Sequence, residues 1–179
     1  MEELLQFIFG ELDNRGINYM LSGSVALNSY TVPRFTRDID IVIELQETNF
    51  DSFADIFTNR ACYFHRESTQ EAVFRQGMFN IIDWESGFKV DFIIKKENLF
   101  HQSEFSRKQR KIILGNTAGW VISPEDLVIA KFIWIQDVFS EQQLLDIRNL
   151  LTDNAQLDAD YIKRWIFQLG LTNFNLFEP

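Results

Sequence analysis

The sequence predicts an α+β domain in which a mixed sheet with flanking helices is followed by a C-terminal segment of three helices. Short segments that alternate apolar and polar residues indicate strands, and longer segments with apolar residues three or four positions apart indicate helices. From residue 123 onward the pattern is helical throughout. We expect residues 1–120 to form the core of the domain and residues 121–179 to pack on it as a helical segment.

The composition is that of a globular protein with a large aromatic core. Of the 179 residues, 46% are hydrophobic, 24% are charged and 18 are phenylalanine. The chain has no apolar run long enough to span a membrane, and its acidic N-terminus lacks the basic region of a signal peptide. Its single cysteine, Cys62, cannot form an internal disulfide. We therefore expect a reduced, cytoplasmic protein with no membrane partner.

The first predicted elements alternate between helix and strand. The segment DIDIVIEL has an apolar residue at every second position, which is the period of a strand with one buried face. In chain order, we expect a helix before Gly16, a strand at 17–22, a helix at 24–30, a strand at 38–45, a helix at 48–60 and a strand at 62–66.

The remaining elements begin at caps and turns. Ser68 with Glu71 has the spacing of a capping box, which predicts the start of a helix. Ser140 with Gln143 has the same spacing. Ser123 precedes a proline, which suits the first helical position. In chain order, we expect a helix at 68–76, two strands within 78–96 joined by the turn ESG, strands at 110–114 and 119–123, and helices that begin at residues 123, 140 and 158.

Three aspartates suggest a metal site. Asp38 and Asp40 project to the same side of their predicted strand, and two close carboxylates repel each other unless a cation lies between them. Acidic residues that alternate with apolar residues also occur on any half-exposed strand. Asp91 interrupts the apolar run FKVDFII, where a lone charge is costly unless it is paired. If the two strands are neighbours, the three carboxylates suit Mg²⁺ and an in-line displacement at phosphorus, with Asp91 as ligand or base.

A Gly-Ser pair after an apolar strand suggests a phosphate site. Gly23 lets the backbone approach a phosphate closely, and Ser24 begins a helix whose free N–H groups favour anions. Arg34 adds positive charge nearby, and Thr36 lies on the same side of an extended chain as Arg34.

These motifs together resemble a known signature. LSGSVAL followed by PRFTRDIDIVI resembles the nucleotidyltransferase superfamily typified by DNA polymerase beta, in which a Gly-Gly or Gly-Ser turn and a short helix precede Asp-x-Asp on a strand. A third acidic residue follows on a later strand. More narrowly, RFTRDID is similar to small bacterial nucleotidyltransferases related to the AbiEii abortive-infection toxins. The C-terminal helices resemble the tail of such proteins, so the resemblance covers most of residues 1–170 and implies a polymerase-beta-like sheet.

The resemblance implies an enzyme that transfers an NMP group from an NTP to an acceptor, with Mg²⁺ or Mn²⁺ as cofactor. The implied catalytic and metal-binding residues are Asp38, Asp40 and Asp91, and the implied nucleotide-binding residues are Gly23, Ser24, Arg34, Thr36 and Lys131. Asp146 falls where toxin relatives carry an acidic residue. The chain departs from the family pattern at Ser24, where many members have a second glycine, and at Thr31, where relatives often have glycine.

The acceptor and the partners stay open. The net charge of −9 argues against a general nucleic-acid-binding surface. The basic stretch SRKQRK at 106–111 is read first as a solvated loop and otherwise as a polyanion-binding patch for an RNA end such as that of tRNA. A protein hydroxyl and a small molecule are equally consistent with the sequence. Two other functions compete: a toxin–antitoxin or regulatory component that binds a protein such as a cognate antitoxin, and a nucleotide-binding protein without turnover.

Overall fold

Seven strands form one mixed sheet in the computed structural model, which describes residues 1–177. Their order is β3-β4-β5-β2-β1-β7-β6. β2 is parallel to β5 and β1 is parallel to β7, whereas the other neighbours are antiparallel. The strands are β1 (Tyr19–Ser22), β2 (Asp38–Ile43), β3 (Cys62–Tyr63), β4 (Met78–Asp83), β5 (Lys89–Ile94), β6 (Gln109–Leu114) and β7 (Thr117–Val121).

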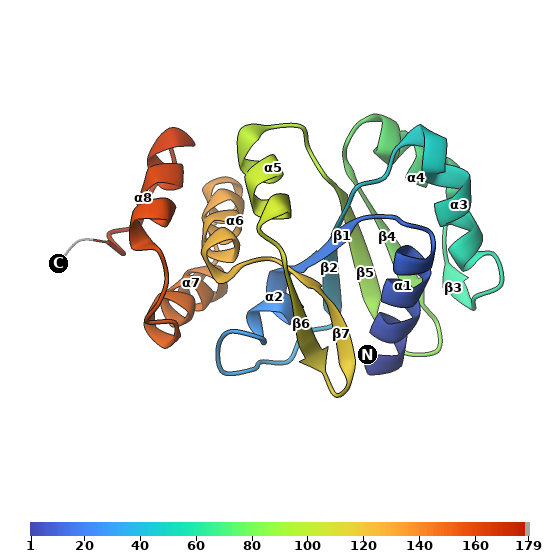
Figure 1. Cartoon of the computed structure of the whole chain (residues 1–179), viewed down its shortest axis with the longest axis horizontal. Coiled ribbons are helices and arrows are strands. Elements are labelled where there is room, and N and C mark those ends of the chain that lie inside the picture. The colour runs from blue at the N-terminus through green and yellow to red at the C-terminus, as the bar shows by residue number, and fades with distance from the viewer. Residues whose placement is uncertain (178–179) are drawn as a thin grey trace.

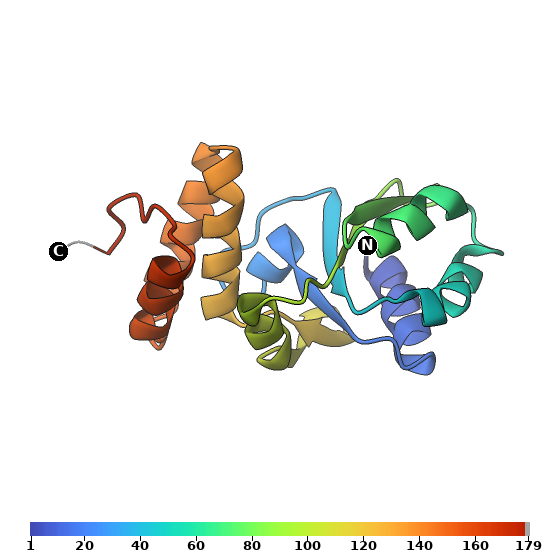
Figure 2. The ribbon, with the colours of Figure 1, turned by 90° about the horizontal axis from the view of Figure 1, so that it is seen from above.

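The helices gather at the two ends of this sheet. Figures 1 and 2 agree that α6, α7 and α8 lie together at one end of the molecule and that α1, α3 and α4 lie at the other. None of the helices in the described part of the chain combines the length and the apolar character that crossing a membrane requires. The helices are α1 (Glu2–Asn14), α2 (Gly23–Leu27), α3 (Phe50–Ala54), α4 (Arg66–Phe74), α5 (Leu99–Ser106), α6 (Pro124–Asp137), α7 (Glu141–Asp153) and α8 (Ala159–Gln168).

The face of the sheet toward α1 and α3 is apolar. Phe9 of α1 stacks on Tyr19 of β1, with ring centroids 4.8 Å apart. Phe53 of α3 meets Phe92 of β5 edge to face at 5.2 Å. Because alternate residues of a strand point to one side, these aromatic residues share a face with the isoleucines of β2 and form the main core.

The opposite face of β2 and β5 carries acidic residues. Asp40 is paired in register with Asp91 on one side and with Ser22 on the other. Gly23 begins α2 directly after β1, and its Cα faces the carboxylate of Asp40. The sequence alternation therefore divides the sheet into a packed aromatic face and a polar face beside the start of α2.

Most expected elements are confirmed. Strands form within all the predicted strand segments, and the chain between β4 and β5 turns at the predicted ESG sequence. Ser123 caps α6 by accepting a hydrogen bond from the backbone N–H of Asp126, and Pro124 is the first residue of that helix. The Ser140 side chain accepts from the backbone N–H of Gln143, so α7 also begins where its cap predicted.

Two expectations were wrong. Residues 48–60 do not form one helix, because α3 is flanked by the 3₁₀ turns Glu47–Asn49 and Asp55–Phe57. The buried residues Phe50, Phe53, Ala54 and Phe57 have the spacing of an α-helix, so the apolar pattern does not distinguish one helix from an α-helix with 3₁₀ turns at its ends.

The capping box of Ser68 with Glu71 was the second error. The helix α4 begins at Arg66, and its cap is His65, whose Nδ1 accepts a hydrogen bond from the backbone N–H of Ser68 at 3.2 Å. The His65 imidazole accepts the capping hydrogen bond that we had expected the Ser68 hydroxyl to accept, and Ser68 lies inside the first turn.

Truncating Phe92 tests the aromatic core. We expect Phe92→Ala to lower the free energy of unfolding by about 3–5 kcal/mol, because the removed ring leaves a cavity among Phe53, Phe57 and Phe79. Phe167→Ala removes the same atoms from a side chain that is 87% exposed and should cost less than about 0.5 kcal/mol. Urea denaturation measures both, and equal losses would contradict this assignment of the core.

Candidate active site

Parallel pairing of β2 with β5 brings the three predicted aspartates to one side of the sheet. Asp40 lies directly opposite Asp91, and Asp38 lies opposite Lys89. Paired residues on parallel strands point to the same face, and residues two apart on one strand do so as well. The strands therefore carry three carboxylates and one ammonium on a single polar surface.

Repulsion and burial act on Asp40. Burial raises the pKa of its carboxyl above the usual value, and the nearby charges of Asp91 and Asp38 raise it further. Asp91 is 6% exposed, and its Oδ1 is buried without a hydrogen-bond partner. A buried carboxylate oxygen without a partner is costly, so this group of carboxylates favours a further cation or proton.

Lys89 supplies part of that positive charge. Its Nζ lies 2.7 Å from Oδ2 of Asp91 and 3.4 Å from Oδ1 of Asp38. The hydrogen bond to Asp91 is the main reason that the pKa of Lys89 is raised. Lys89 was not predicted from the sequence, although its position two residues before Asp91 on a strand was a usable signal.

Gly23 packs tightly against Asp40. It has a left-handed backbone, with φ of +60°, and a methyl group at its Cα would overlap the carboxylate of Asp40. Only glycine accepts both the dihedral angle and the contact. The residue that was predicted to approach a phosphate thus lies directly beside one of the predicted metal ligands.

A second group of charged residues forms beside the first around Asp146. The Nη2 of Arg34 lies 2.7 Å from the Ser24 hydroxyl and 2.9 Å from Oδ2 of Asp146, and its Nε lies 3.1 Å from Oδ1. Lys131 donates from Nζ to Oδ2 of Asp146 at 2.9 Å and to Gln143 at 2.7 Å. One carboxylate therefore holds both predicted cations.

Burial and hydrogen bonding oppose each other in this second group. Burial would raise the pKa of Asp146, but hydrogen bonds from Arg34 and Lys131 hold it below the usual value. Burial lowers the pKa of Lys131, and its hydrogen bond to Asp146 works against that change. The contacts favour a charged carboxylate between two cations, with Asp146 only 1% exposed and Lys131 4% exposed.

Side-chain hydrogen bonds hold the segment PRFTRD, in the loop between α2 and β2, near its start and near its end. The side chain of Asn28 accepts from the backbone N–H of Arg34 and donates to its carbonyl oxygen, both at 3.0 Å. Thr36 is half-buried, and its hydroxyl bonds the backbone of Asp38. Thr36 thus shapes the approach to β2, whereas Asn28 fixes the backbone that carries the Arg34 guanidinium.

Most of the predicted site residues fall into these two groups. The acidic cluster consists of Asp38, Asp40 and Asp91, with Gly23 against it and Lys89 bridging two of its members. In the second group Asp146 joins Arg34 and Lys131, and Arg34 also reaches the Ser24 hydroxyl. Thr36 belongs to neither group. The bridging role of Asp146 could not be read from the sequence, because its partners are distant along the chain.

The acidic cluster has the chemistry that a divalent metal requires. Its ligand atoms are carboxylate oxygens, one of them without a partner, and the charge on Asp40 is disfavoured by its neighbours. Over residues 1–177, however, no three His, Cys, Asp or Glu side chains stand close enough to hold a metal ion as they are placed. Asp38, whose side chain is 56% exposed, is the outermost of the three.

The basic stretch at 106–111 divides between two surroundings. Lys108 and Arg110 lie over the ring of Trp120, and Lys108 shares the Phe105 ring with Lys95. Arg107 pairs with Asp126 and Glu125, Arg110 also pairs with Asp13, and Lys111 lies over the Tyr30 ring. Part of the positive charge of the stretch is thus neutralised by carboxylates, and part gathers beside Phe105 and Trp120.

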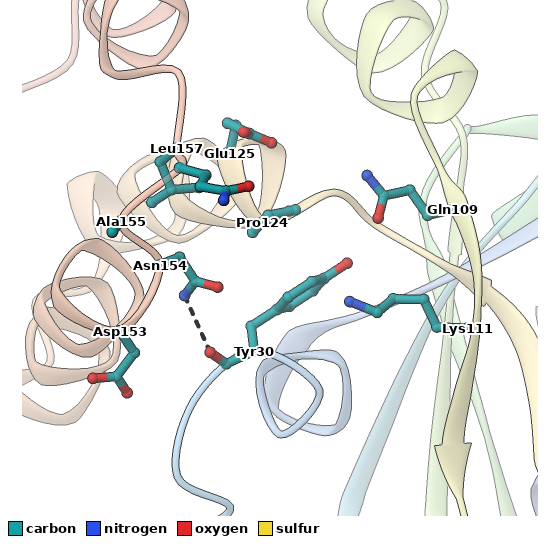
Figure 3. A pocket seen from close by; sticks show the side chains of 10 residues that line it. Tyr30, Gln109, Lys111, Pro124, Glu125, Asp153, Asn154, Ala155 and Leu157 are labelled. Carbon is teal, nitrogen blue, oxygen red and sulfur yellow. Dashed lines mark hydrogen bonds between the residues drawn. The ribbon is translucent and has the colours of Figure 1, made fainter.

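A cavity of about 510 Å³ lies on another side of α2. Figure 3 shows Lys111 of β6 pointing toward the ring of Tyr30, with Asn154 from the α7–α8 connection beside it. The Lys111 ammonium is 4.0 Å from the centre of that ring. The residues that line this cavity include none of the predicted site residues.

Comparison with protein-family models and with curated proteins gives no match. Comparison with solved structures gives matches over most of the chain. The solution structure of the antibiotic-resistance factor ANT(2'')-Ia matches with a TM-score of 0.54 and 13% identity, over 95% of this chain and 93% of that one. The lincomycin-bound crystal structure of the lincosamide antibiotic adenylyltransferase LnuA matches with a TM-score of 0.52 and 14% identity, over 86% and 98%.

A third match is an antigenic nucleotidyltransferase-like protein from Paracoccidioides brasiliensis, with a TM-score of 0.51 and 14% identity over 94% of this chain and 86% of that one. The chain has the polymerase-beta-like nucleotidyltransferase fold, an α+β mixed sheet with C-terminal helices, as the sequence resemblance implied. At these identities the matches show the fold alone.

Alanine at position 23 tests the close contact with Asp40. Gly23→Ala should lower the free energy of unfolding by about 1–3 kcal/mol more than Gly170→Ala, because it adds steric overlap to the cost of a left-handed backbone. Gly170 has φ of +64° with no atom near its would-be side chain, so it controls for the dihedral angle. Chemical denaturation gives both values, and equal losses would show that the carboxylate of Asp40 moves away freely.

Removing the charge of Asp146 tests the second group. We expect Asp146→Asn to cost about 3–5 kcal/mol at neutral pH, because Lys131 and Arg34 lose a buried counter-ion. Since the pKa of Asp146 is lowered in the folded state, the stability that the parent protein has over Asp146→Asn should shrink as the pH falls below about 4. Asp153→Asn changes an exposed residue of the same helix and should cost less than about 0.5 kcal/mol. A loss that is equal at all pH values would rule out the ion pair as its cause.

Proposed function

We propose that this protein is a metal-dependent nucleotidyltransferase that transfers an NMP group from an NTP to an acceptor hydroxyl. One observation carries the proposal: Asp40 and Asp91 lie opposite each other on adjacent parallel strands, with Asp38 two residues earlier and Gly23 against Asp40. A carboxylate cluster of this kind is expensive in a purely structural sheet. The similar folds of adenylyltransferases support the same reading.

In this proposal Asp38, Asp40 and Asp91 hold Mg²⁺ or Mn²⁺, which when bound supplies positive charge to the phosphates. The acceptor oxygen forms a bond to the α-phosphorus, and the bond from that phosphorus to the bridging oxygen of the β-phosphate breaks. Pyrophosphate leaves, and the acceptor proton passes to Asp91. Asp91 is proposed as this base or as the third ligand, and its Oδ1 is buried without a hydrogen-bond partner while its Oδ2 is paired with Lys89.

The second group would hold the triphosphate. Arg34 and Lys131 place two cations at one carboxylate, and Ser24 adds a hydroxyl at 2.7 Å from Arg34. Asp146 fixes both cations before a ligand arrives, so little side-chain ordering remains to be done on binding. Thr36 contributes at the start of β2, where its hydroxyl bonds the backbone of Asp38.

A small molecule is the acceptor class that we favour. Two cations of the stretch 106–111, Arg107 and Arg110, are paired with carboxylates, and the net charge is −9. Both features disfavour a polyanion such as tRNA and favour a neutral or cationic acceptor. Two of the similar structures were solved with small antibiotic molecules, lincomycin and adenylyl-2''-tobramycin.

A second candidate is a toxin–antitoxin or regulatory component, as the AbiEii likeness suggested, which acts through a protein partner. Exposed apolar side chains at the turn between α6 and α7 favour it. Trp134, Val138 and Phe139 are 61%, 67% and 58% exposed. Clusters of this kind commonly mark a contact with another protein. This surface is compatible with nucleotidyl transfer, because it shares none of the residues of the acidic cluster.

The proposed activity is tested by transfer of label from each α-³²P-NTP to small hydroxylated acceptors and to tRNA, with Mg²⁺ or Mn²⁺. We expect transfer by the parent protein and a loss on the order of a hundredfold or more in Asp40→Asn and in Asp91→Asn. Asp55→Asn alters an exposed aspartate and should retain full activity. Absence of transfer to every acceptor, or equal transfer by Asp40→Asn, would refute the proposal.

A further inference from the structure

Lys89 occupies a special position in the acidic cluster. It lies opposite Asp38 in the parallel register and two residues before Asp91 on the same strand. Both relations direct its side chain to the polar face of the sheet. Its ammonium lies 2.7 Å from one carboxylate and 3.4 Å from the other, so it bridges Asp91 and Asp38.

The other cations of the site are held elsewhere. Arg34 and Lys131 are both hydrogen-bonded to Asp146. Within residues 1–177, the ion pairs made by Asp38 and Asp91 are all with Lys89. Lys89 is therefore the positive charge that keeps these two carboxylates together in the chain alone.

One ammonium does not neutralise the cluster. Three carboxylates and one lysine leave an excess of negative charge, and Oδ1 of Asp91 has no hydrogen-bond partner. A divalent cation would be attracted by that excess but would share its ligands with Lys89, and two positive charges in one place repel each other. The cluster thus combines the ligands for a metal with a competitor for the same oxygens.

We propose that Lys89 is a built-in counter-ion that competes with the divalent cation for Asp38 and Asp91. The resting site then binds a free metal ion weakly, and binds it well when an NTP brings phosphate oxygens that give the Lys89 ammonium another partner. The nucleotide and the metal consequently bind with positive cooperativity. This inference rests on the proposed function, because it requires that the acidic cluster hold a metal.

Lys89 is well suited to such an exchange. Its side chain is 40% exposed, so the ammonium can leave the carboxylates without opening the core. The side chain is long and has rotatable bonds, and its charge does not depend on a fixed planar geometry. A lysine that only stabilised the fold would show no change in behaviour when nucleotide binds.

Binding of Mn²⁺ to the full chain, followed by electron paramagnetic resonance of the free ion, tests this inference. Without nucleotide, Lys89→Met should bind Mn²⁺ about tenfold more tightly than the parent protein, because the competing charge is gone. After subtraction of the Mn²⁺ that the same concentration of the α,β-methylene analogue of ATP binds without protein, the analogue should tighten Mn²⁺ binding by the parent protein and should tighten it much less in Lys89→Met.

Two variants serve as controls. Lys96→Met removes the same charge from an exposed position beyond the other end of β5 and should bind Mn²⁺ like the parent protein. Lys89→Arg keeps the charge and should stay weak without nucleotide. If Lys89→Met does not fold, the parent protein and Lys89→Arg still decide the matter, because equal Mn²⁺ affinity with and without the analogue would overturn the inference.

The outcomes separate this inference from the proposed function. Mn²⁺ binding by Lys89→Met that is no tighter than binding by the parent protein would overturn the role of Lys89 and leave the metal site standing. Absence of Mn²⁺ binding in every variant, with and without the analogue, would overturn both.

Discussion

The parallel pairing of β2 with β5 is the constraint on which the rest of the site depends. It sets Asp40 beside Asp91 and leaves Asp38 two residues away on the same face. Burial and mutual repulsion then raise the pKa of Asp40, so the arrangement costs stability in the chain alone. A sheet held only by its aromatic face would gain by replacing these carboxylates with apolar residues, which is the physical basis of the proposed metal site.

Each of the two groups of charged residues contains a residue of the opposite charge. Lys89, on the sheet, offsets the carboxylates that would bind a metal, whereas Asp146, on α7, offsets the cations that would bind phosphate. Each predicted group thus carries its own internal counter-ion. Charged ligands can then enter by exchanging partners with these counter-ions, so that no charge is left buried and unpaired during binding.

The sequence predicted the elements of the site better than their contacts. The Asp-x-Asp alternation, the Gly-Ser turn and the Ser123 cap are local signals, and local patterns identify strands, turns and helix starts. The register of Asp40 with Asp91 joins strands about fifty residues apart, and no local period encodes it. The bridging lysine had a local signal in its spacing from Asp91, but its partner Asp38 lies on the other strand. The 3₁₀ turns beside α3 were missed because the apolar residues at 50, 53, 54 and 57 have the spacing of one continuous helix.

The C-terminal helices belong to the site as much as the sheet does. Asp146 on α7 reaches Arg34 across 112 residues of sequence, and Lys131 on α6 meets the same carboxylate. The sheet alone would present an acidic cluster with Gly23 and Ser24 but without Lys131, and Arg34 would have lost the partner that orients it. In the proposed function a triphosphate needs cations whose positions are fixed before it binds, and α6 and α7 supply Lys131 and the Asp146 carboxylate that holds Arg34.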